Sequence, residues 1–446
     1  MKKPGLIFYM FLLKKIIQIY FLVSFVLAQG PTNSFGIGSI QKWNSPSQSG
    51  IGSIGLVPSF QNNVSLLNPV TWSNLKFTHL SVSYNGLESK IAKNNVTNGF
   101  SNLQSVQLII PVKNKYAVGL ALHPFSYQQI VLSDTGYSDI LAFDDTLTFD
   151  KRYDQSGGIN ALDLSFASSL FKGNRIGVTF QLLFGSSRQN KSLIINQIPY
   201  TQTSRLNYSG VTSTVFVSQK TNFADFYFNT SFSIKPLAAI YTKLYPFDDT
   251  NNNGYHDFTY NYLSPGYDFP HPDDIPEPDE SRLTDIYDRS SLGMGIAKKI
   301  FSRIQISGEL QNNKDRASFN TLLPNNFNYR IKNDNHYSLG LAWFPDDLSF
   351  RFIDNFTFRS GLVFSSFTYD EYENSSQSRI VNKNDITQLG YTIGFGYKFK
   401  AVGNQIDFSY YSGARDYPNM YSDERFREFH VGISIADIWF IKRRQR

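Results

Sequence analysis

A run of Asp, Asn and Gly residues at positions 249–257 has the spacing of a calcium-binding loop. Calcium takes hard oxygen ligands around a sharp turn. The residues that would supply the oxygens are Asp249, Asn251, Asn253, Tyr255 (through its backbone carbonyl) and Asp257. Gly254 takes the turn position, but Tyr260 stands where a complete EF-hand has a bidentate Glu. We expect Ca²⁺ as a structural cofactor of an extracellular loop, and the alternative is a solvated loop tip, which these residue types also favour.

Patterns that would indicate catalysis are weak. Gly50, Gly52 and Gly55 form a G-x-G-x-x-G motif, but a dinucleotide site needs a strand before it and a helix after it. The surrounding Gly/Ser/Asn-rich segment offers neither, so the glycines indicate a compact, turn-rich segment. The six histidines form no H-E-x-x-H pair, and no G-x-S-x-G elbow occurs. We predict that the protein is not an enzyme, and only Asp/His pairs that folding brings together are left open.

The amino-terminal 28 residues have the features of a secretory signal peptide. Basic residues precede an apolar run at 16–28, which is too short for a membrane-spanning helix of about 20 residues. An amino-terminal anchor is the alternative. The chain has 42 Lys+Arg and 36 Asp+Glu, and four of the lysines lie at positions 2, 3, 14 and 15. The exported chain is therefore almost neutral, and no nucleic-acid partner is expected.

The rest of the chain alternates with period two, which indicates β-strands with one apolar face. One example is 174–185, where Ile176, Val178 and Phe180 alternate with polar or small residues. The polar faces of these strands carry Asp163, Arg175, Gln181 and Asp225. If the strands enclose a lumen, these side chains either line a pathway through it or hydrogen-bond one another. Strands are predicted at 77–84, 103–112, 115–125, 158–170, 174–185, 223–234, 237–246, 289–300, 302–311, 335–344, 354–367, 386–399, 404–412 and 426–436.

Short and long connections alternate between these strands. Tight turns are predicted at sites such as Lys113-Asn114 and Lys235-Pro236, and long loops at sites such as 126–157 and 186–222. Because a further strand would break this alternation, we assign 206–217 to a loop. Outer-membrane barrels combine short turns on one rim with long loops on the other. The expected fold class is all-β, a 14-stranded antiparallel transmembrane β-barrel, and a secreted sandwich or propeller is the alternative.

The segment before the first strand resembles the amino-terminal region of FadL-type outer-membrane proteins. The similar features are Ser34–Gly38, the glycines of 50–55, Asn62-Asn63, and Leu67-Asn68-Pro69, although Val70 stands where that family commonly has Ala. The resemblance implies a barrel closed by an amino-terminal hatch, with apolar substrates bound near it. The same fold includes shuttle barrels of type IX secretion, which do not import lipids, and fold analogy does not separate the two.

We therefore expect a passive outer-membrane channel for hydrophobic small molecules such as fatty acids or hydrocarbons. The expected hatch and gate residues are Gly50, Gly52, Gly55, Asn62, Asn68 and Pro69. The expected segments are a signal peptide (1–28), a hatch (29–75), a barrel (76–440) with an acidic loop at 247–288, and a basic periplasmic tail (441–446). The alternative is a non-transporting barrel that serves protein secretion or surface interaction. Expected partners are outer-membrane lipid, a hydrophobic ligand, and secretion or surface proteins.

Overall fold

A computed structural model describes most of the chain from Gly36 to Asp437. The described ranges are 36–60, 63–91, 96–113, 115–140, 145–171, 173–195, 198–243, 247–248, 258–260, 263–267, 279–301, 303–317, 329–344, 351–372, 380–400, 404–417 and 423–437. Among these residues, no helix has the length and apolarity needed to cross a membrane.

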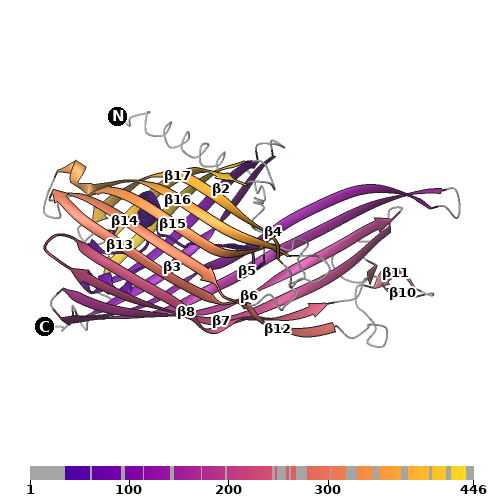
Figure 1. Cartoon of the computed structure of the whole chain (residues 1–446), viewed down its shortest axis with the longest axis horizontal. Helices are drawn as coiled ribbons and strands as arrows, with labels where there is room; N and C mark the ends of the chain where they lie inside the picture. The colour runs from indigo at the N-terminus through magenta and orange to yellow at the C-terminus, as the bar shows by residue number, and fades with distance from the viewer. Residues whose placement is uncertain are drawn as a thin grey trace, which may run out of the picture.

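Antiparallel strands dominate the structure (Figure 1). In chain order the elements are β1 (Ser39–Ile40), α2 (Pro46–Gly50), η3 (Pro69–Asn74), β2 (Thr78–Ile91), β3 (Val96–Val112), β4 (Tyr116–Ile140), β5 (Asp145–Phe171), β6 (Asn174–Ile195), β7 (Ile198–Lys220), β8 (Asp225–Lys243), β9 (Phe247–Asp248), β10 (Phe258–Tyr260), β11 (Leu263–Tyr267), β12 (Asp279–Tyr287), β13 (Arg289–Phe301), β14 (Ile304–Asp315), β15 (Tyr329–Trp343), η4 (Phe352–Asn355), β16 (Phe356–Tyr372), β17 (Ile380–Lys400), β18 (Asn404–Asp416) and β19 (Glu424–Asp437).

The wall is a closed, 14-stranded barrel, as the sequence predicts. Each wall strand pairs with its neighbour in the chain, and β19 pairs with β2 along its whole length to close the ring. β13 pairs with the first half of β8 and β12 pairs with its second half. β12 and β13 therefore count as one strand of the wall. Closure satisfies the backbone hydrogen bonds without a sheet edge, as a lipid environment requires.

The outside of the wall is apolar and the inside is small or polar. In β13, for example, buried and exposed residues alternate, and the exposed ones include Leu292, Met294 and Ile296. The same alternation leaves Leu339 and Ile393 exposed on other strands. This pattern gives the barrel an apolar belt of the kind that faces lipid.

Two details of the strand prediction are wrong, and they cancel in the count. Residues 206–217, predicted as a loop, belong to β7. The predicted strands 223–234 and 237–246, with a turn at Lys235-Pro236, are one strand, β8, which ends at Lys243. Proline cannot donate to a sheet ladder and is found at bulges, and Pro236 lies where the β7–β8 register is irregular. The proline therefore bends a strand without ending it.

The predicted long loops at 126–157 and 186–222 are largely wrong as well. β4 and β5 pair without a break from Ser126 opposite Ile159 to Ile140 opposite Asp145. β6 and β7 likewise pair from Asn174 opposite Gln219 to Ile195 opposite Ile198. We call the end with the short β3–β4, β5–β6 and β13–β14 connections the turn end, and the opposite end the far end. The projecting sheet is the part of β4–β8 and β12 that runs past the wall at the far end (Figure 1).

The projecting sheet starts at a line of irregularities across neighbouring strands. The β4–β5 register shifts between Pro124 and Ser126, and the β7–β8 register is irregular on both sides of Lys235. Gly157 and Gly185 have φ of 121° and 152°, values that suit glycine alone. Bulges bend strands and increase their twist, so this line turns the barrel wall outwards.

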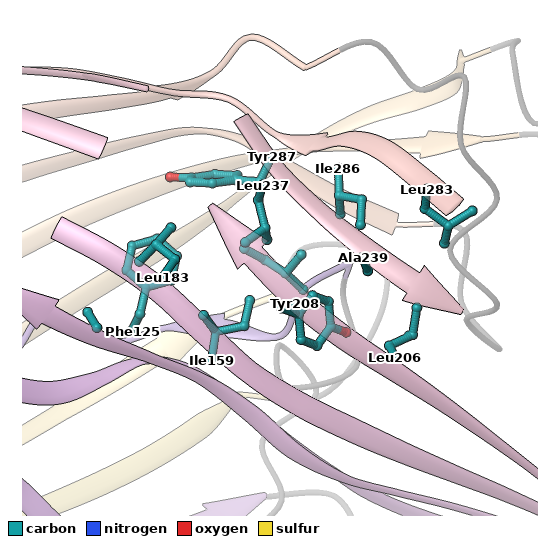
Figure 2. Close-up of a cluster of buried hydrophobic side chains, with 12 residues drawn as sticks. Phe125, Ile159, Leu183, Leu206, Tyr208, Leu237, Ala239, Leu283, Ile286 and Tyr287 are labelled. Carbon is teal, nitrogen blue, oxygen red and sulfur yellow. The ribbon is translucent and has the colours of Figure 1, made fainter. Parts of the chain in front are cut away.

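A cluster of buried apolar side chains holds the bend on its inner side (Figure 2). This bend cluster consists of Ile37, Phe125, Ile159, Ala161, Leu183, Leu206, Tyr208, Leu237, Ala239, Leu283, Ile286 and Tyr287. It joins the amino-terminal segment to β4–β8 and β12, so the base of the projecting sheet has a core of its own.

Candidate functional site

The described residues of the segment before β2, 36–60 and 63–75, pack against the inner side of the barrel wall, and we call them the plug. The plug begins beside β4, where β1 pairs antiparallel with Ser126 and Tyr127, and it ends just before β2 at the turn end. α2 packs against β16–β19, whereas η3 packs against β3–β7. The plug therefore bridges opposite halves of the wall.

Local hydrogen bonds explain why the plug folds as it does. Ser45 caps α2 in a capping box with Gln48, and Pro46 takes the first helical position, where its missing N–H is not needed. Gln48 Nε2 also donates to Gly55 O at 3.2 Å and to Ser65 Oγ at 2.9 Å. One glutamine thus ties the helix to the turns that follow it.

The predicted residues Asn68 and Pro69 shape the second half of the plug. Asn68 caps η3 by accepting from Val70 N–H, and its Nδ2 donates to Leu56 O at 2.8 Å. Pro69 begins η3, and a Cβ on the wall residue Gly177 would lie 3.0 Å from its Cγ. Asn68 therefore joins two parts of the plug, and Pro69 places η3 against β6 of the wall.

Glycines allow the plug backbone to touch the wall backbone. A Cβ on Gly50 would lie 2.8 Å from Gly394 Cα, and a Cβ on Gly361 would lie 2.4 Å from Gly52 N. A Cβ on Gly340 would lie 2.3 Å from Ile51 O. Real Cβ atoms do not come so close, so the wall carries glycine where the plug passes. Gly55 faces the plug itself, because its Cβ would meet Leu67 Cδ2 at 2.6 Å.

Buried wall side chains bind the plug backbone directly. Glu309 Oε2 accepts from Leu56 N–H at 2.7 Å, and its Oε1 lies 3.5 Å from Lys42 Nζ. Arg359 donates through Nε to Ser59 O at 2.9 Å and through Nη1 to Asp407 at 2.7 Å. The Arg359 side chain is completely buried, at 0% exposure.

Two apolar clusters complete the closure of the barrel. In the first, Ile51, Ile54, Leu56, Val57 and Val70 of the plug pack against Phe216, Tyr227, Ala297 and Ala342 of the wall. In the second, Phe60, Val64, Leu66, Trp72 and Leu75 pack against Ile109, Ala117 and Ala167. Hydrogen bonds and apolar packing together hold the plug against the wall at the turn end.

A cavity of about 310 Å³ lies between the plug and the far end. Ser39–Asn44 of the plug contribute to its lining, and the remaining lining comes mainly from the far halves of the wall strands. Its ten charged side chains are balanced in number and comprise Lys42, Arg289, Lys314, Lys332, Arg415, Asp163, Asp315, Asp334, Glu424 and Glu428. The cavity is therefore a vestibule of mixed lining, in which apolar and aromatic side chains such as Phe100 and Phe426 lie beside paired charges.

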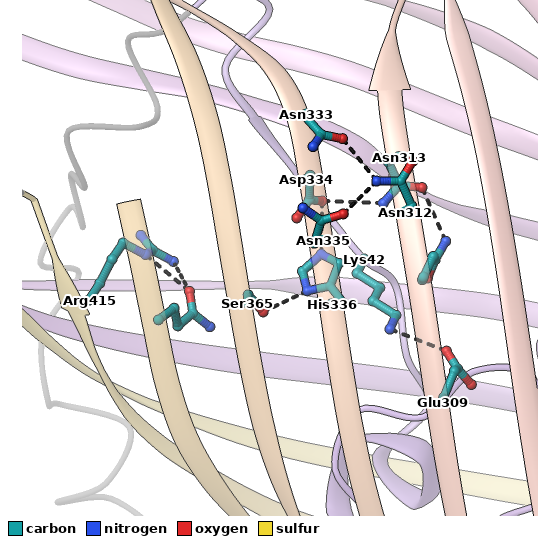
Figure 3. Close-up of polar contacts among 12 residues, drawn as sticks. Lys42, Glu309, Asn312, Asn313, Asn333, Asp334, Asn335, His336, Ser365 and Arg415 are labelled. Carbon is teal, nitrogen blue, oxygen red and sulfur yellow. Dashed lines mark hydrogen bonds and ion pairs between the residues drawn. The ribbon is translucent and has the colours of Figure 1, made fainter. Parts of the chain in front are cut away.

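Three histidines of the vestibule each contact a carboxylate. His123 Nε2 lies 3.1 Å from Asp163, and Gln181 donates to the same carboxylate at 2.9 Å. His336 Nε2 lies 2.8 Å from Asp334 Oδ2, and His336 Nδ1 lies 2.6 Å from Ser365 Oγ (Figure 3). In the third pair, His430 Nε2 lies 3.2 Å from Glu428 Oε2. Trp43 of the plug stacks on His123 at 4.9 Å.

Ionisable groups at the mouth of the vestibule also bind one another. Glu424 accepts from Tyr417 OH at 2.6 Å, from Arg415 at 3.1 Å and from Ser89 Oγ. Burial raises the pKa of Tyr417, so the phenol stays protonated and keeps its hydrogen bond. Burial lowers the pKa of Lys332, and the nearby Arg330 adds to this effect. Glu424, Tyr417, Arg415 and Ser89 therefore form a structural network.

Several predicted residues fall outside this site. Asp163 and Gln181 line the vestibule and hydrogen-bond each other, whereas Arg175 and Asp225 do not line it. Asn62 and the whole run 249–257 lie outside the described residues, so the calcium site stays a prediction. Among the described residues, no group of His, Asp and Glu is arranged to hold a metal ion.

Sequence reasoning missed the residues that pin the plug. Lys42, Glu309 and Arg359 are single charged residues in otherwise unremarkable contexts. Glu309 and Arg359 do carry one usable signal. They stand on the inward, small-residue face of their strands, beside Ser307 and Thr357. A charge at such a position must find a partner inside the barrel.

Comparison with known proteins agrees with the barrel. A family model described as BamG matches residues 12–445. No curated protein sequence matches the chain. The CymD monoaromatic hydrocarbon channel is 13% identical, with 91% of this chain and 99% of that chain covered and a TM-score of 0.51. A Pseudomonas aeruginosa FadL homologue is 12% identical, with 89% and 98% covered and a TM-score of 0.55. At such identities the likeness establishes a shared fold.

Proposed function

The chain belongs to the BamG family and has the FadL-type barrel fold, and on that premise we propose that it is a bacterial outer-membrane protein that works by contact with other proteins. In this proposal the plug closes the lumen permanently. The projecting sheet stands outside the cell, where it serves surface interaction or protein secretion.

The observation that carries this proposal is the length of the strands. β4 and β5 have 25 and 27 residues, whereas a tilted strand crosses a membrane with about 9–11 residues. At about 3.3 Å per residue, the part of β4 beyond Leu122 has a contour length of roughly 60 Å. A channel needs no such structure, but a platform for other proteins does.

The interior of the barrel supports the same proposal. A passive channel for apolar molecules is expected to contain an apolar pocket that leads to a movable gate. Here paired charges interrupt the apolar lining of the vestibule, and the backbone of the plug is held by Glu309 and Arg359. Moving the plug would take Lys42 and Leu56 N–H from Glu309. It would also take the Ser59 carbonyl from Arg359, which keeps Asp407 as its partner in the wall. Each lost hydrogen bond to a buried charged group costs about 1.5–3 kcal/mol.

Passive transport of hydrophobic molecules is the second candidate function, with Gly50, Gly52, Gly55, Asn68 and Pro69 in the gate. One observation favours it. Apolar side chains, among them Leu87, Phe100 and Phe426, line part of the vestibule and offer a surface to an apolar ligand. Purified protein that binds toluene or laurate saturably, and loses binding in a Phe100→Ala variant, would support this candidate.

A deletion strain separates the two candidates. The deletion strain is complemented with the native gene or with a trimmed gene in which an Asn-Gly turn replaces residues 131–154. The two-residue turn then connects Ile130 to Gln155, which lie opposite each other in the native sheet. We expect the trimmed protein to leave uptake of labelled laurate and toluene unchanged but to fail to restore surface and secreted proteins. Normal surface proteins in the trimmed strain, together with reduced uptake in the deletion strain, would overturn the proposal.

A further inference from the structure

The open edge of β4 is the feature of the projecting sheet that the proposed function does not explain. β3 pairs with β4 only between Val112, which lies opposite Tyr116, and Val106, which lies opposite Leu122. Beyond that point β4 continues to Ile140, paired on its other side with β5. Among the described residues, no strand pairs with Leu132–Ile140 on the side away from β5.

The molecule itself shows that this edge accepts a strand. Lower on the same edge, β1 pairs antiparallel with β4 through Ser39–Tyr127 and Ile40–Ser126. The next pair is hydrogen-bonded, because Gln41 N–H donates to Phe125 O at 2.8 Å. The plug thus occupies the position that β3 leaves, and the edge continues past it towards the hairpin tip.

The register tells which backbone groups the open edge presents. In an antiparallel strand the N–H and C=O groups of alternate residues point to opposite sides. Since the carbonyl of Phe125 points towards β1, and the β4–β5 register is regular from Ser126 to Ile140, the odd-numbered residues point away from β5. The groups of Ser133, Thr135, Tyr137 and Asp139 therefore face the open side.

This edge lacks the devices that normally prevent strand addition. Natural edge strands are protected by Lys, Pro, bulges or short length. From Phe125 to Ile140 the chain contains no Lys and no Pro, and the β4–β5 register has no bulge beyond Ser126. The charges of this stretch are Asp134 and Asp139, which disfavour an acidic strand but not a basic one. A long, regular edge of this kind is expected to be covered in the working protein.

The charge of the hairpin selects the partner. Between positions 131 and 154 the hairpin has six acidic residues, Asp134, Asp139, Asp144, Asp145, Asp150 and Asp154, against two basic residues, Lys151 and Arg152, so its net charge is negative. We propose that Leu132–Ile140 is a docking edge for an extended, basic segment of a partner protein, which adds to the projecting sheet as a further strand. This proposal rests on the proposed function and specifies how the projecting sheet binds.

Amide exchange of the purified full-length protein tests the proposal, with synthetic peptides as probes. One peptide alternates Lys and Val, and its matched control alternates Glu and Val. We expect the Lys/Val peptide to bind saturably, to slow exchange at Ser133, Thr135 and Tyr137, and to bind more weakly as salt is added. The amides of Asp134 and Gly136, which face β5, are expected to be protected with or without peptide.

A proline variant removes one donor from the open side. Thr135→Pro is expected to weaken binding of the Lys/Val peptide about fivefold, the equivalent of one hydrogen bond, and Thr135→Val keeps the N–H and is expected to bind normally. Protection at Asp134 and Gly136 in the proline variant shows that the hairpin is intact. If these amides are exposed, Tyr137→Pro provides the same test nearer to the tip.

Three results would overturn the proposal. The first is protection of the Ser133, Thr135 and Tyr137 amides before any peptide is added, which means that another strand already covers the edge. The second is equal binding of the Glu/Val peptide. The third is unchanged binding of the Lys/Val peptide in both proline variants. Each of these outcomes is independent of the proposed function, because the trimmed strain tests the whole hairpin and not this edge.

Discussion

The plug region and the projecting sheet each contain an Arg–Asp ion pair, but the two pairs differ in burial and in what they do. In the plug region Arg359 and Asp407 form an ion pair at 2.7 Å with side chains 0% and 4% exposed. In the projecting sheet Arg152 and Asp154 form one at 2.8 Å with side chains 57% and 29% exposed. The first pair lies in a sealed interior and holds a backbone in place. The second faces water, where charge mainly keeps a surface soluble.

The two regions also differ in how their strands end. Around the plug, every wall strand has neighbours on both sides and the ring is closed. In the projecting sheet, β5 is the one strand among the described residues that pairs with Leu132–Ile140 of β4. The comparison indicates that the barrel is built for closure and the projecting sheet for contact.

The largest effect is expected from breaking the buried ion pair. Arg359→Ala leaves the Asp407 carboxylate without its main partner and Ser59 O without a donor, so we expect a loss of about 4 kcal/mol in the free energy of unfolding. Urea unfolding in lipid vesicles, followed by tryptophan fluorescence, measures it. The double variant Arg359→Ala/Asp407→Ala removes the stranded charge and is expected to recover much of the loss. A double variant as unstable as the single one would show that the charge is not the cause.

A somewhat smaller and local effect is expected at the bend cluster. Leu206 is 1% exposed and lies among the apolar side chains at the base of the projecting sheet. Leu206→Ala is expected to cost about 3 kcal/mol, and the loss should appear as faster amide exchange in β5–β8 beyond the bend. Amides at the turn end of the same strands should keep their protection. Equal acceleration at both ends would mean that the projecting sheet has no separate stability.

The close contact between plug and wall predicts a moderate effect of one methyl group. A Cβ on Gly361 would lie 2.5 Å from Gly52 Cα, so Gly361→Ala is expected to displace the plug at a cost of about 1–3 kcal/mol. Planar-bilayer recordings should show an increased ion conductance. Gly308→Ala is the matched control, because its nearest atoms would be 3.7 Å away. Similar conductance in the two variants would argue against a tightly held plug.

The smallest effect is expected from the exposed ion pair. Arg152→Ala removes the 2.8 Å contact with Asp154, but exposed pairs contribute about 0–1 kcal/mol because water and salt screen them. Unfolding in urea should therefore be nearly unchanged. A loss as large as that of Arg359→Ala would remove the electrostatic distinction between the two regions.

The sequence predicts the barrel well because its signal is local. Period two is visible within each strand, as in 174–185, and it requires no knowledge of the neighbours. Lys235-Pro236 misleads for the same reason. A proline at a bulge and a proline in a turn look alike unless the partner strand β7 is known. The prediction misses the strand that contains 206–217 and counts β8 as two strands. These two errors cancel, so the predicted number of strands is nevertheless correct.

The contacts of the plug are non-local and could not be predicted. Leu56 and Glu309 are 253 positions apart, and Arg359 and Ser59 are 300 apart. Which wall residue meets which plug residue depends on the stagger of all the strands between them. Gly50 and Gly52 were identified as turn-forming residues, but their contacts with Gly394 and Gly361 follow only from that stagger.

Locking the plug tests the central claim, that the barrel is closed while it works. A Cβ on Gly295 would lie 3.4 Å from Leu56 Cβ, close to the separation of about 3.5–4.5 Å in disulfides, and the native chain has no cysteine. The same Cβ would lie 2.8 Å from Val57 Cγ2, so Leu56→Cys/Gly295→Cys is made together with Val57→Ala. It then places a bond between the plug and β13, and each single cysteine variant in the same background is a control. Under oxidising conditions we expect cells with the locked protein to keep a normal set of surface proteins and normal uptake of labelled laurate and toluene. Loss of uptake on oxidation, restored by a reductant, would contradict the account and show that the plug is the gate of a channel.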